Sequence, residues 1–195
     1  MNKGLSESGI QPENESSNEQ NSDEDHDIIR LVLNESVNAY RLLIDKYQVP
    51  VYNLFIRMLH NREDAEELTQ DVFVKVYEAL PGFRFEYRFF SWLYRIALNT
   101  ALSHMKRQRS FVGIEHLANL SAENNERDAY NDIHLKMAVE QLKVRSRAVI
   151  IMKYYQQLSY REVAFALDIP ETKVRSRLYD ARLQLKEILE KTGYF

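Results

Sequence analysis

The sequence of 195 residues contains no cysteine, which excludes disulfides, thiolate zinc sites and cysteine nucleophiles and is compatible with a reducing cytoplasm. Glycine is also scarce. None of the five glycines lies in a phosphate-binding cluster, and neither a G-x-S-x-G motif nor the Glu-x-x-His spacing of helical di-iron sites occurs. We therefore expect no enzyme, no cofactor, no metal site and no small-molecule substrate.

Long hydrophobic runs are missing as well. The longest purely apolar runs, such as Val149 to Met152, contain only a few residues, whereas a membrane-spanning helix needs roughly 20. The first residues, MNKGLSESGI, lack the basic and then apolar pattern of a signal peptide. No segment alternates with the period of two that is typical of strands. These absences predict an all-α protein that is soluble and cytoplasmic.

The net charge of −3 is distributed unevenly along the chain. Residues 1–27 contain one lysine and eight acidic residues, a net charge of −7, so the remainder carries +4. Because residues 1–27 have almost nothing to bury, we expect a disordered acidic tail. This tail is interpreted as a solubilising segment, with electrostatic modulation of partner binding as the alternative.

Residues 28–109 show helical periodicity. Asn61 is a candidate N-cap, and the helix that follows should end near Pro81 and Gly82. Its apolar residues recur at steps of three and four: Ala65, Leu68, Val72, Val76 and Leu80. A second helix is predicted to open at Ser91 and to run into the basic sequence HMKRQR. The aromatic and basic loop FRFEYRFF (Phe83 to Phe90) lies between the two helices.

Residues 110–132 lose this periodicity and contain five acidic residues against one arginine, which indicates a flexible acidic linker. Periodicity returns in residues 133–195. Two small helical domains joined by a linker are therefore expected.

The second domain contains a helix-turn-helix pattern. Ser159 and Glu162 have the spacing of a capping box, and Asp168 to Pro170 should end the short helix that follows. Val163, Ala164 and Leu167 should form the inner face of this helix. The next helix is expected to bury Val174, Leu178, Ala181 and Leu185. A short turn between two amphipathic helices is typical of the helix-turn-helix motif.

The outer face of the second helix of this motif is basic. Residues 170–186 contain five basic and two acidic residues, a balance of +3. An arginine there, such as Arg175, can hydrogen-bond a guanine in bidentate fashion. The alternative is an ordinary solvated charged face.

The quoted motifs resemble a known family. LSYREVAFALDIPETKVRSRLYDARLQL is similar to the fourth region of bacterial sigma factors of the extracytoplasmic-function (ECF) group, in the sigma-70 family. DAEELTQDVFVKVYEAL (Asp64 to Leu80) and FSWLYRIALNTAL (Phe90 to Leu102) resemble the second region. The order and spacing agree, and the resemblance covers about residues 28–190. It implies a region 2 domain over 28–109 and a region 4 domain over 133–195.

The resemblance implies that the helix after Asn61 docks on the clamp helices of the largest subunit of core RNA polymerase. The implied polymerase-binding residues are Glu67, Gln70, Asp71, Phe73, Val74 and Tyr77. An acidic and amide strip beside exposed aromatics suits a basic protein partner. The alternative is a solvated acidic face with Phe73 and Tyr77 turned into the core.

The loop is implied to capture a base flipped from the downstream promoter element, with phosphate contacts from the following helix. The implied residues are Phe83, Arg84, Glu86, Tyr87, Arg88, Phe89, Arg95, Asn99, Lys106 and Arg107. Phe85, Tyr87 and Phe90 depart from the residue types common in the family at these positions. Trp92 is interpreted as core packing.

The second helix of the motif is implied to read the upstream promoter element. The implied DNA-binding residues are Thr172, Lys173, Arg175, Ser176, Arg177, Tyr179 and Arg182. Asp180 departs from a position that is commonly basic, so it either points away from the phosphates or changes which base is accepted.

The sequence therefore predicts a sigma factor that binds core RNA polymerase, directs it to promoter DNA and assists opening of the duplex. The family also implies an anti-sigma partner, often in the inner membrane. A stand-alone helix-turn-helix regulator is the alternative, but it would need a ligand pocket, a receiver or a dimerisation face in the first domain.

Overall fold

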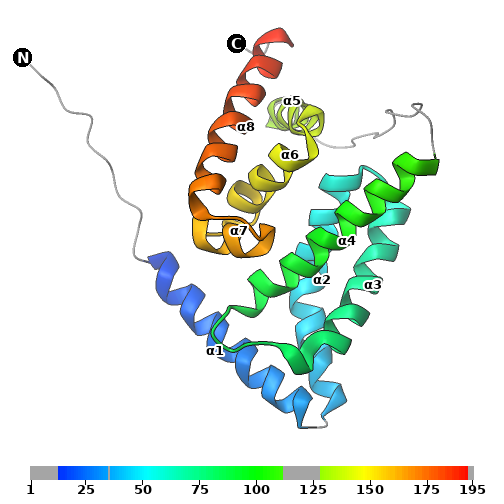
Figure 1. The fold of residues 1–195 in the computed structure, drawn as a ribbon, viewed down its shortest axis with the longest axis vertical. Coiled ribbons are helices and arrows are strands. Elements are labelled where there is room, and N and C mark those ends of the chain that lie inside the picture. Colours follow the sequence, from blue (N-terminus) through cyan, green and yellow to red (C-terminus); the bar gives the residue numbers. More distant parts are fainter. Residues whose placement is uncertain (1–12, 35, 112–127, 193–195) are drawn as a thin grey trace, which may run out of the picture.

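The computed structural model describes residues 13–34, 36–111 and 128–192, and every regular element within them is helical (Figure 1). The α-helices are α1 (Glu13–Leu33), α2 (Val37–Leu59), α3 (Arg62–Ala79), α4 (Phe89–Phe111), α5 (Asp128–Gln141), α6 (Val144–Ile150), α7 (Tyr160–Leu167) and α8 (Glu171–Lys191). A 3₁₀ turn covers Leu80–Gly82 and a π-helical turn covers Ile151–Tyr155. These elements confirm the all-α prediction. Residues 1–12 of the predicted tail and most of the predicted linker (residues 112–127) lie outside the described residues.

Helix α2 supplies one long buried face to the first domain. Its buried residues are Ala39, Tyr40, Leu43, Tyr47, Val51, Leu54, Phe55 and Met58. Their steps of three and four place them on one stripe of the helix, against α3 and α4. The hydroxyl of Tyr94 on α4 donates to the carbonyl of Pro50 inside α2 at 2.9 Å, which joins the two helices.

Helix α3 begins and ends as predicted. The Asn61 side chain accepts a hydrogen bond from the Asp64 amide at 3.1 Å, so Asn61 is the N-cap. The helix ends at Ala79, immediately before the turn that contains Pro81 and Gly82. Helix α4 begins at Phe89, two residues before the predicted start at Ser91.

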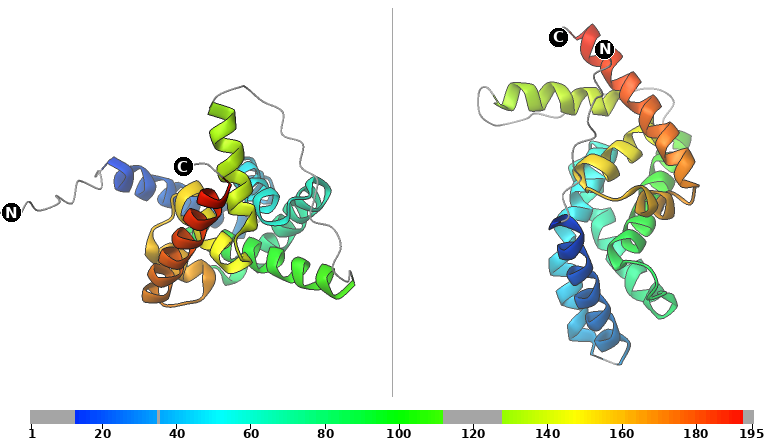
Figure 2. Two further views of the ribbon diagram at one scale, coloured as in Figure 1. Left: turned by 90° about the horizontal axis from the view of Figure 1, so that it is seen from above. Right: turned by 90° about the vertical axis from the view of Figure 1, so that its left-hand side faces the viewer.

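The prediction of disorder is wrong for the described part of residues 1–27, because α1 begins at Glu13 and lies along α2 (Figure 2). Asp25 is only 2% exposed and accepts hydrogen bonds from the Tyr47 hydroxyl and, at 2.7 Å, from Lys46. Burial and the Asp25 carboxylate raise the pKa of Tyr47 far above its ordinary value. The low content of apolar residues could not indicate that this segment is ordered, because polar hydrogen bonds attach it to α2.

The second domain contains the predicted helix-turn-helix. The Ser159 side chain accepts from the Glu162 amide at 3.2 Å, and the Glu162 carboxylate accepts from the Ser159 amide at 2.8 Å, which confirms the capping box. Asp168 ends α7 in the left-handed conformation, with φ of 54°. Helix α8 buries Val174, Leu178 and Ala181 as predicted, whereas Leu185 is half-buried.

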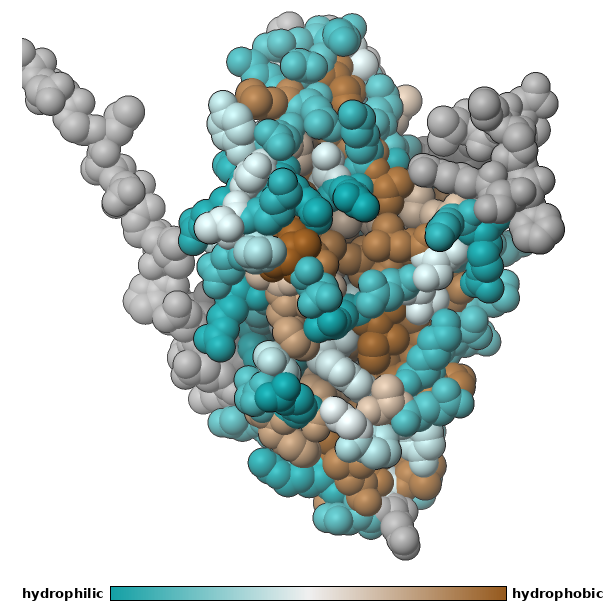
Figure 3. Space-filling view, viewed as in Figure 1, coloured by the Kyte–Doolittle hydropathy of each residue, from teal (hydrophilic) through white to brown (hydrophobic). Residues whose placement is uncertain are grey.

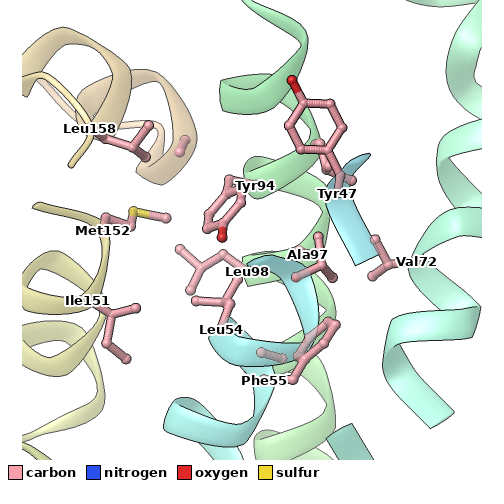
Figure 4. Packing of buried hydrophobic residues seen from close by; sticks show 14 of the residues in the cluster. Tyr47, Leu54, Phe55, Val72, Tyr94, Ala97, Leu98, Ile151, Met152 and Leu158 are labelled. Carbon is pink, nitrogen blue, oxygen red and sulfur yellow. The ribbon is translucent and has the colours of Figure 1, made fainter. Parts of the chain in front are cut away.

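The two domains pack against each other over one continuous hydrophobic cluster. Helix α7 lies against α4, and α6 contacts α2. From the second domain, Ile151, Met152 and Leu158 face Tyr94 and Leu98 of α4 (Figure 4). Figure 3 shows hydrophobic residues gathered toward the middle of the molecule, between α6 and α4. The sequence patterns predicted each domain but not this contact between them.

A buried arginine joins the domains at the end of α2. Arg147 of α6 is 7% exposed and donates to the carbonyl of Met58, in the last turn of α2, at 3.0 Å. It also donates to the backbone carbonyls of Glu140 and Leu142. A cation at a helix C-terminus is electrostatically favourable. The guanidinium also lies 2.6 Å from Nε2 of His60, so this nitrogen must accept and the imidazole is neutral.

Lowering the pH is expected to destabilise the protein through His60. Burial and the Arg147 guanidinium lower the pKa of His60 from 6.5 to about 4. Between these two values the unfolded chain binds a proton that the folded chain does not, so the free energy of unfolding falls as the pH falls through this window. Urea denaturation at several pH values measures the change.

A His60→Asn variant is the matched control, because asparagine tolerates the left-handed φ of 58° at this position and does not titrate. The Glu140 carboxylate lies 3.3 Å from Nδ1 of His60, and burial raises its pKa above the ordinary 4.5. Protonation of Glu140 therefore raises the free energy of unfolding as the pH falls, which is opposite in sign to the effect of His60. The Glu140 effect occurs nearer pH 4.5. The variant should lose less stability than the wild type between pH 6.5 and about 5. Equal losses would contradict the role of His60.

Candidate polymerase-docking and DNA-binding surfaces

The outer side of α3 presents an acidic and amide strip. Glu67, Gln70, Asp71 and Val74 are exposed, and the Tyr77 side chain is 40% exposed. Phe73 is only 6% exposed, so the expectation of an exposed aromatic there is wrong. The reason is that Phe73 lies beside Val72 on the inner face of α3, where its carbonyl also accepts a hydrogen bond from the Tyr40 hydroxyl at 2.6 Å.

An apolar groove runs beside this strip, between α2 and α3. It has a volume of about 460 Å³. Its lining residues are Val37, Tyr40, Ile44, Gln48, Thr69, Gln70, Phe73, Val74 and Tyr77. Phe73 thus forms part of the groove wall. Three other predicted docking residues, Gln70, Val74 and Tyr77, also line the groove. The strip and the groove together can hold an amphipathic helix with basic residues along one edge.

Two aromatic residues of the loop between α3 and α4 belong to the core. Phe83 is 6% exposed and Phe89 is fully buried, so in this structure neither ring is exposed to contact a base. The two rings pack edge-to-face at 6.0 Å between centroids, and Trp92 contacts both of them, which fits its interpretation as core packing. Alternation of aromatic and charged residues in the loop does not indicate which rings turn inward.

The exposed part of the loop is Arg84, Phe85 and Glu86. Arg84 and Glu86 form an ion pair at 2.7 Å. Phe85 is 37% exposed and packs against the His26 ring of α1 at 5.3 Å between centroids. Helix α1, which the sequence did not predict, therefore supports the loop.

Tyr87 and Arg88 face the second domain. The Tyr87 ring stacks on Phe165 of α7 with 4.2 Å between centroids. Arg88 forms an ion pair with Glu162 at 2.6 Å. On α4, Arg95 lies 3.3 Å from the Asp168 carboxylate. Asn99, Lys106 and Arg107 are exposed farther along α4.

Helix α8 presents the predicted basic face to solvent, and hydrophilic residues cover most of its surface in Figure 3. Thr172, Lys173, Arg175, Ser176, Tyr179 and Arg182 are exposed and Arg177 is half-buried. Asp180 is also exposed on this helix. The Arg175 guanidinium lies 4.3 Å from the centroid of the Tyr160 ring and 4.0 Å from Glu171. The sequence patterns do not indicate that Tyr160 supports Arg175, because Tyr160 lies on α7 and Arg175 on α8.

Nothing in the described part of the chain forms a cluster of three or more His, Cys, Asp or Glu side chains that could hold a metal ion. Two acidic residues of α3 instead have partners within the chain: Glu66 pairs with Arg62 at 2.9 Å, and Asp64 accepts from Gln108 at 2.9 Å. Among the described helices, none has the length and apolar character needed to cross a membrane.

Comparison with known proteins identifies both domains. The family model for Sigma-70 region 2 matches residues 43–111, and the model for Sigma-70, region 4 matches residues 134–185. The RNA polymerase sigma-H factor of Pseudomonas aeruginosa is 29% identical over 183 residues, which cover 86% of this chain and 95% of that protein. The ECF RNA polymerase sigma-E factor of Escherichia coli is 31% identical over 173 residues, which cover 81% of this chain and 90% of that protein.

Two solved structures share the fold. CnrH in complex with the cytosolic domain of CnrY has a TM-score of 0.66 and 21% identity, with 84% of this chain and 96% of that chain covered. The sigma factor RpoE in complex with the anti-sigma factor NepR from Bartonella quintana has a TM-score of 0.65 and 23% identity. The match covers 77% of this chain and 96% of that chain.

These findings support a sigma factor that directs RNA polymerase, and they give no support to a stand-alone regulator. The chain belongs to the ECF group of sigma-70 family sigma factors, with region 2 in its first helical domain and region 4 in its second.

Proposed function

We propose that this sigma factor divides its two tasks between two separate surfaces. The α3 strip and the adjacent groove bind core RNA polymerase. The basic face of α8 reads the upstream promoter element, with Arg175, Ser176 and Tyr179 toward the bases and Lys173 and Arg177 toward the phosphates. The mechanism is non-covalent and operates in the cytoplasm.

The observation that carries this proposal is the opposite character of the two exposed surfaces. The α3 surface combines acidic and amide groups with an apolar groove, a chemistry suited to an amphipathic protein helix with basic residues. The α8 surface is basic and lies on the second helix of a helix-turn-helix, a chemistry suited to a DNA groove.

The downstream strand is assigned to the loop and α4. Among the loop aromatics that the resemblance assigns to DNA, Phe83 and Phe89 are buried, which leaves Tyr87 to stack on a base, with Arg84 and Arg88 beside it. Arg95, Asn99, Lys106 and Arg107 continue this surface along α4 and can contact bases or phosphates of the opened DNA.

An anti-sigma protein is a further proposed partner. One of the structures with the same fold is a sigma factor bound to an anti-sigma factor, and another holds the cytosolic domain of a second protein. An apolar groove on a sigma factor suits such a partner as well as it suits polymerase. The family resemblance makes a membrane-anchored partner the first to test.

Site-specific photocrosslinking tests the assignment of surfaces. A photoreactive phenylalanine analogue at Val74, which is exposed beside the groove, should crosslink to the largest polymerase subunit in the holoenzyme. The same analogue at Tyr179 should crosslink to the upstream part of promoter DNA. Crosslinking of position 74 to DNA and of position 179 to the largest subunit would contradict the proposed division.

A further inference from the structure

A histidine of α1 holds the backbone of the loop between α3 and α4 (residues 83–88). The loop passes across α1 on its way to α4 (Figure 1). Nε2 of His26 lies 3.1 Å from the carbonyl oxygen of Tyr87. Because a carbonyl oxygen can only accept, Nε2 donates this hydrogen bond. The two residues are 61 positions apart, so the bond fixes the loop from a separate element.

The same imidazole packs against two rings of the loop. Its centroid lies 5.7 Å from that of Phe83 and 5.3 Å from that of Phe85. These two rings meet edge-to-face at 5.3 Å. One turn farther along α1, the guanidinium of Arg30 lies 5.0 Å from the centroid of Phe85. Two residues of α1 therefore contact the loop at both rings and at the Tyr87 carbonyl.

Helix α1 is itself attached to α2, beside the histidine. Asp25 accepts hydrogen bonds from Lys46 and Tyr47 of α2. The Tyr47 ring in turn stacks on Phe90, in the first turn of α4, with 5.4 Å between centroids. The carboxylate that anchors α1 is thus connected to the helix that follows the loop. His26 is held in place by this anchor.

We propose that His26 is a positioning residue for capture of the opened DNA strand. Its hydrogen bond and ring contacts hold the loop in the conformation in which Tyr87 can stack on a base. This inference rests on the proposed role of Tyr87. The support uses Phe85 and Phe90, which depart from the residue types common in the family, so it is a feature of this chain.

The charges on α1 indicate that His26 acts through the loop and not by touching DNA. Asp23, Glu24 and Asp27 are exposed on α1 around His26. Carboxylates at these positions repel the phosphates of a DNA strand. The cation on this part of the helix, Arg30, is paired with Asp27 at 2.7 Å. The effect of His26 on promoter opening should therefore not involve a phosphate contact.

Two substitutions separate the hydrogen bond from the ring contacts. His26→Phe keeps a ring but removes the donor, and His26→Gln keeps a donor but removes the ring. Each should slow promoter opening by the holoenzyme about threefold, and His26→Ala, which removes both contacts, about tenfold. The control Asp23→Asn changes an exposed residue of the same helix and should open the promoter as the wild type does.

A double-mutant cycle with Tyr87→Ala connects the effect to strand capture. Permanganate reactivity of unpaired thymines in a cognate promoter follows the opening. His26→Phe should add little to the defect of Tyr87→Ala, because both substitutions weaken the same contact with the strand, whereas independent defects would multiply.

Two further readouts distinguish positioning from other roles of His26. The variants should keep wild-type affinity for core polymerase, which a general loss of structure in region 2 would reduce. They should also keep the wild-type dependence of promoter binding on salt concentration, which loss of a phosphate contact would weaken.

Hydrogen–deuterium exchange of the free, full-length protein tests the support of the loop without DNA or polymerase. The Tyr87 amide donates to the Arg84 carbonyl at 3.0 Å, so its exchange reports opening of the loop turn. Exchange of residues 84–88 should be faster in His26→Phe than in the wild type and unchanged in α3 and α8.

Unchanged exchange in the loop would overturn the proposal. Defects of His26→Phe and Tyr87→Ala that multiply, or a Tyr87→Ala defect that no His26 variant shares, would also overturn it. Normal promoter opening by Tyr87→Ala would instead contradict the proposed role of Tyr87. The exchange measurement separates this result from a failure of His26 to hold the loop.

Discussion

Replacing Gln70 and Asp71 with lysine is expected to abolish assembly with core RNA polymerase. Both residues are exposed on α3, and Gln70 also lines the apolar groove. Two lysines there would repel a basic partner surface and place charge at the rim of the groove. Loss of residues at the centre of an interface costs ~2 kcal/mol or more, which corresponds to at least about 30-fold in affinity. Co-elution with purified core polymerase in gel filtration measures the loss.

The matched control is Asn38→Lys with Asp45→Lys on α2. These residues are also an exposed amide and an exposed carboxylate, and neither lines the groove. The control should assemble normally. If the Gln70 and Asp71 variant retains its helical circular dichroism and still co-elutes with core, α3 is not the docking surface.

Arg175→Ala is expected to reduce transcription from the cognate promoter while leaving core binding intact. Arg175 is exposed on the first turns of α8, the part of a recognition helix that reaches base edges. Loss of one bidentate contact to guanine costs about 1 to 3 kcal/mol, or ~5- to 150-fold in promoter use. Equal losses of core binding and promoter transcription would contradict the division between the two surfaces.

Variants of Tyr160 refine this test. The Tyr160 ring lies under the Arg175 guanidinium, and Lys153 approaches the same ring at 4.9 Å. Tyr160→Phe keeps the aromatic face and should transcribe nearly as the wild type, because the cation–π contact does not need the hydroxyl. Tyr160→Ala should lose part of the activity that Arg175→Ala loses.

Local patterns predicted the elements that local interactions specify. The N-cap at Asn61, the end of α3 before Pro81 and the capping box of Ser159 and Glu162 are all confirmed, because each depends on residues within one or two turns. The exposure of the α8 residues followed in the same way from burial of Val174 and Leu178 on the opposite face.

Partners distant in the sequence could not be predicted from such patterns. Arg88 and Glu162 are 74 positions apart, and nothing in either segment indicates the other. The family resemblance assigns Phe73, Phe83 and Phe89 to partner surfaces because it places binding functions on their segments, whereas all three rings are buried. The packing that turns these rings inward comes from α1 and α2, whose contacts were not part of the sequence prediction.

The most direct test is run-off transcription with purified core polymerase on a library of genomic fragments, with and without this protein. We predict new transcripts that appear only when the protein is present and that share a two-part upstream motif. Absence of new transcripts, together with tight binding of the protein alone to a short duplex, would contradict the account and indicate a stand-alone regulator.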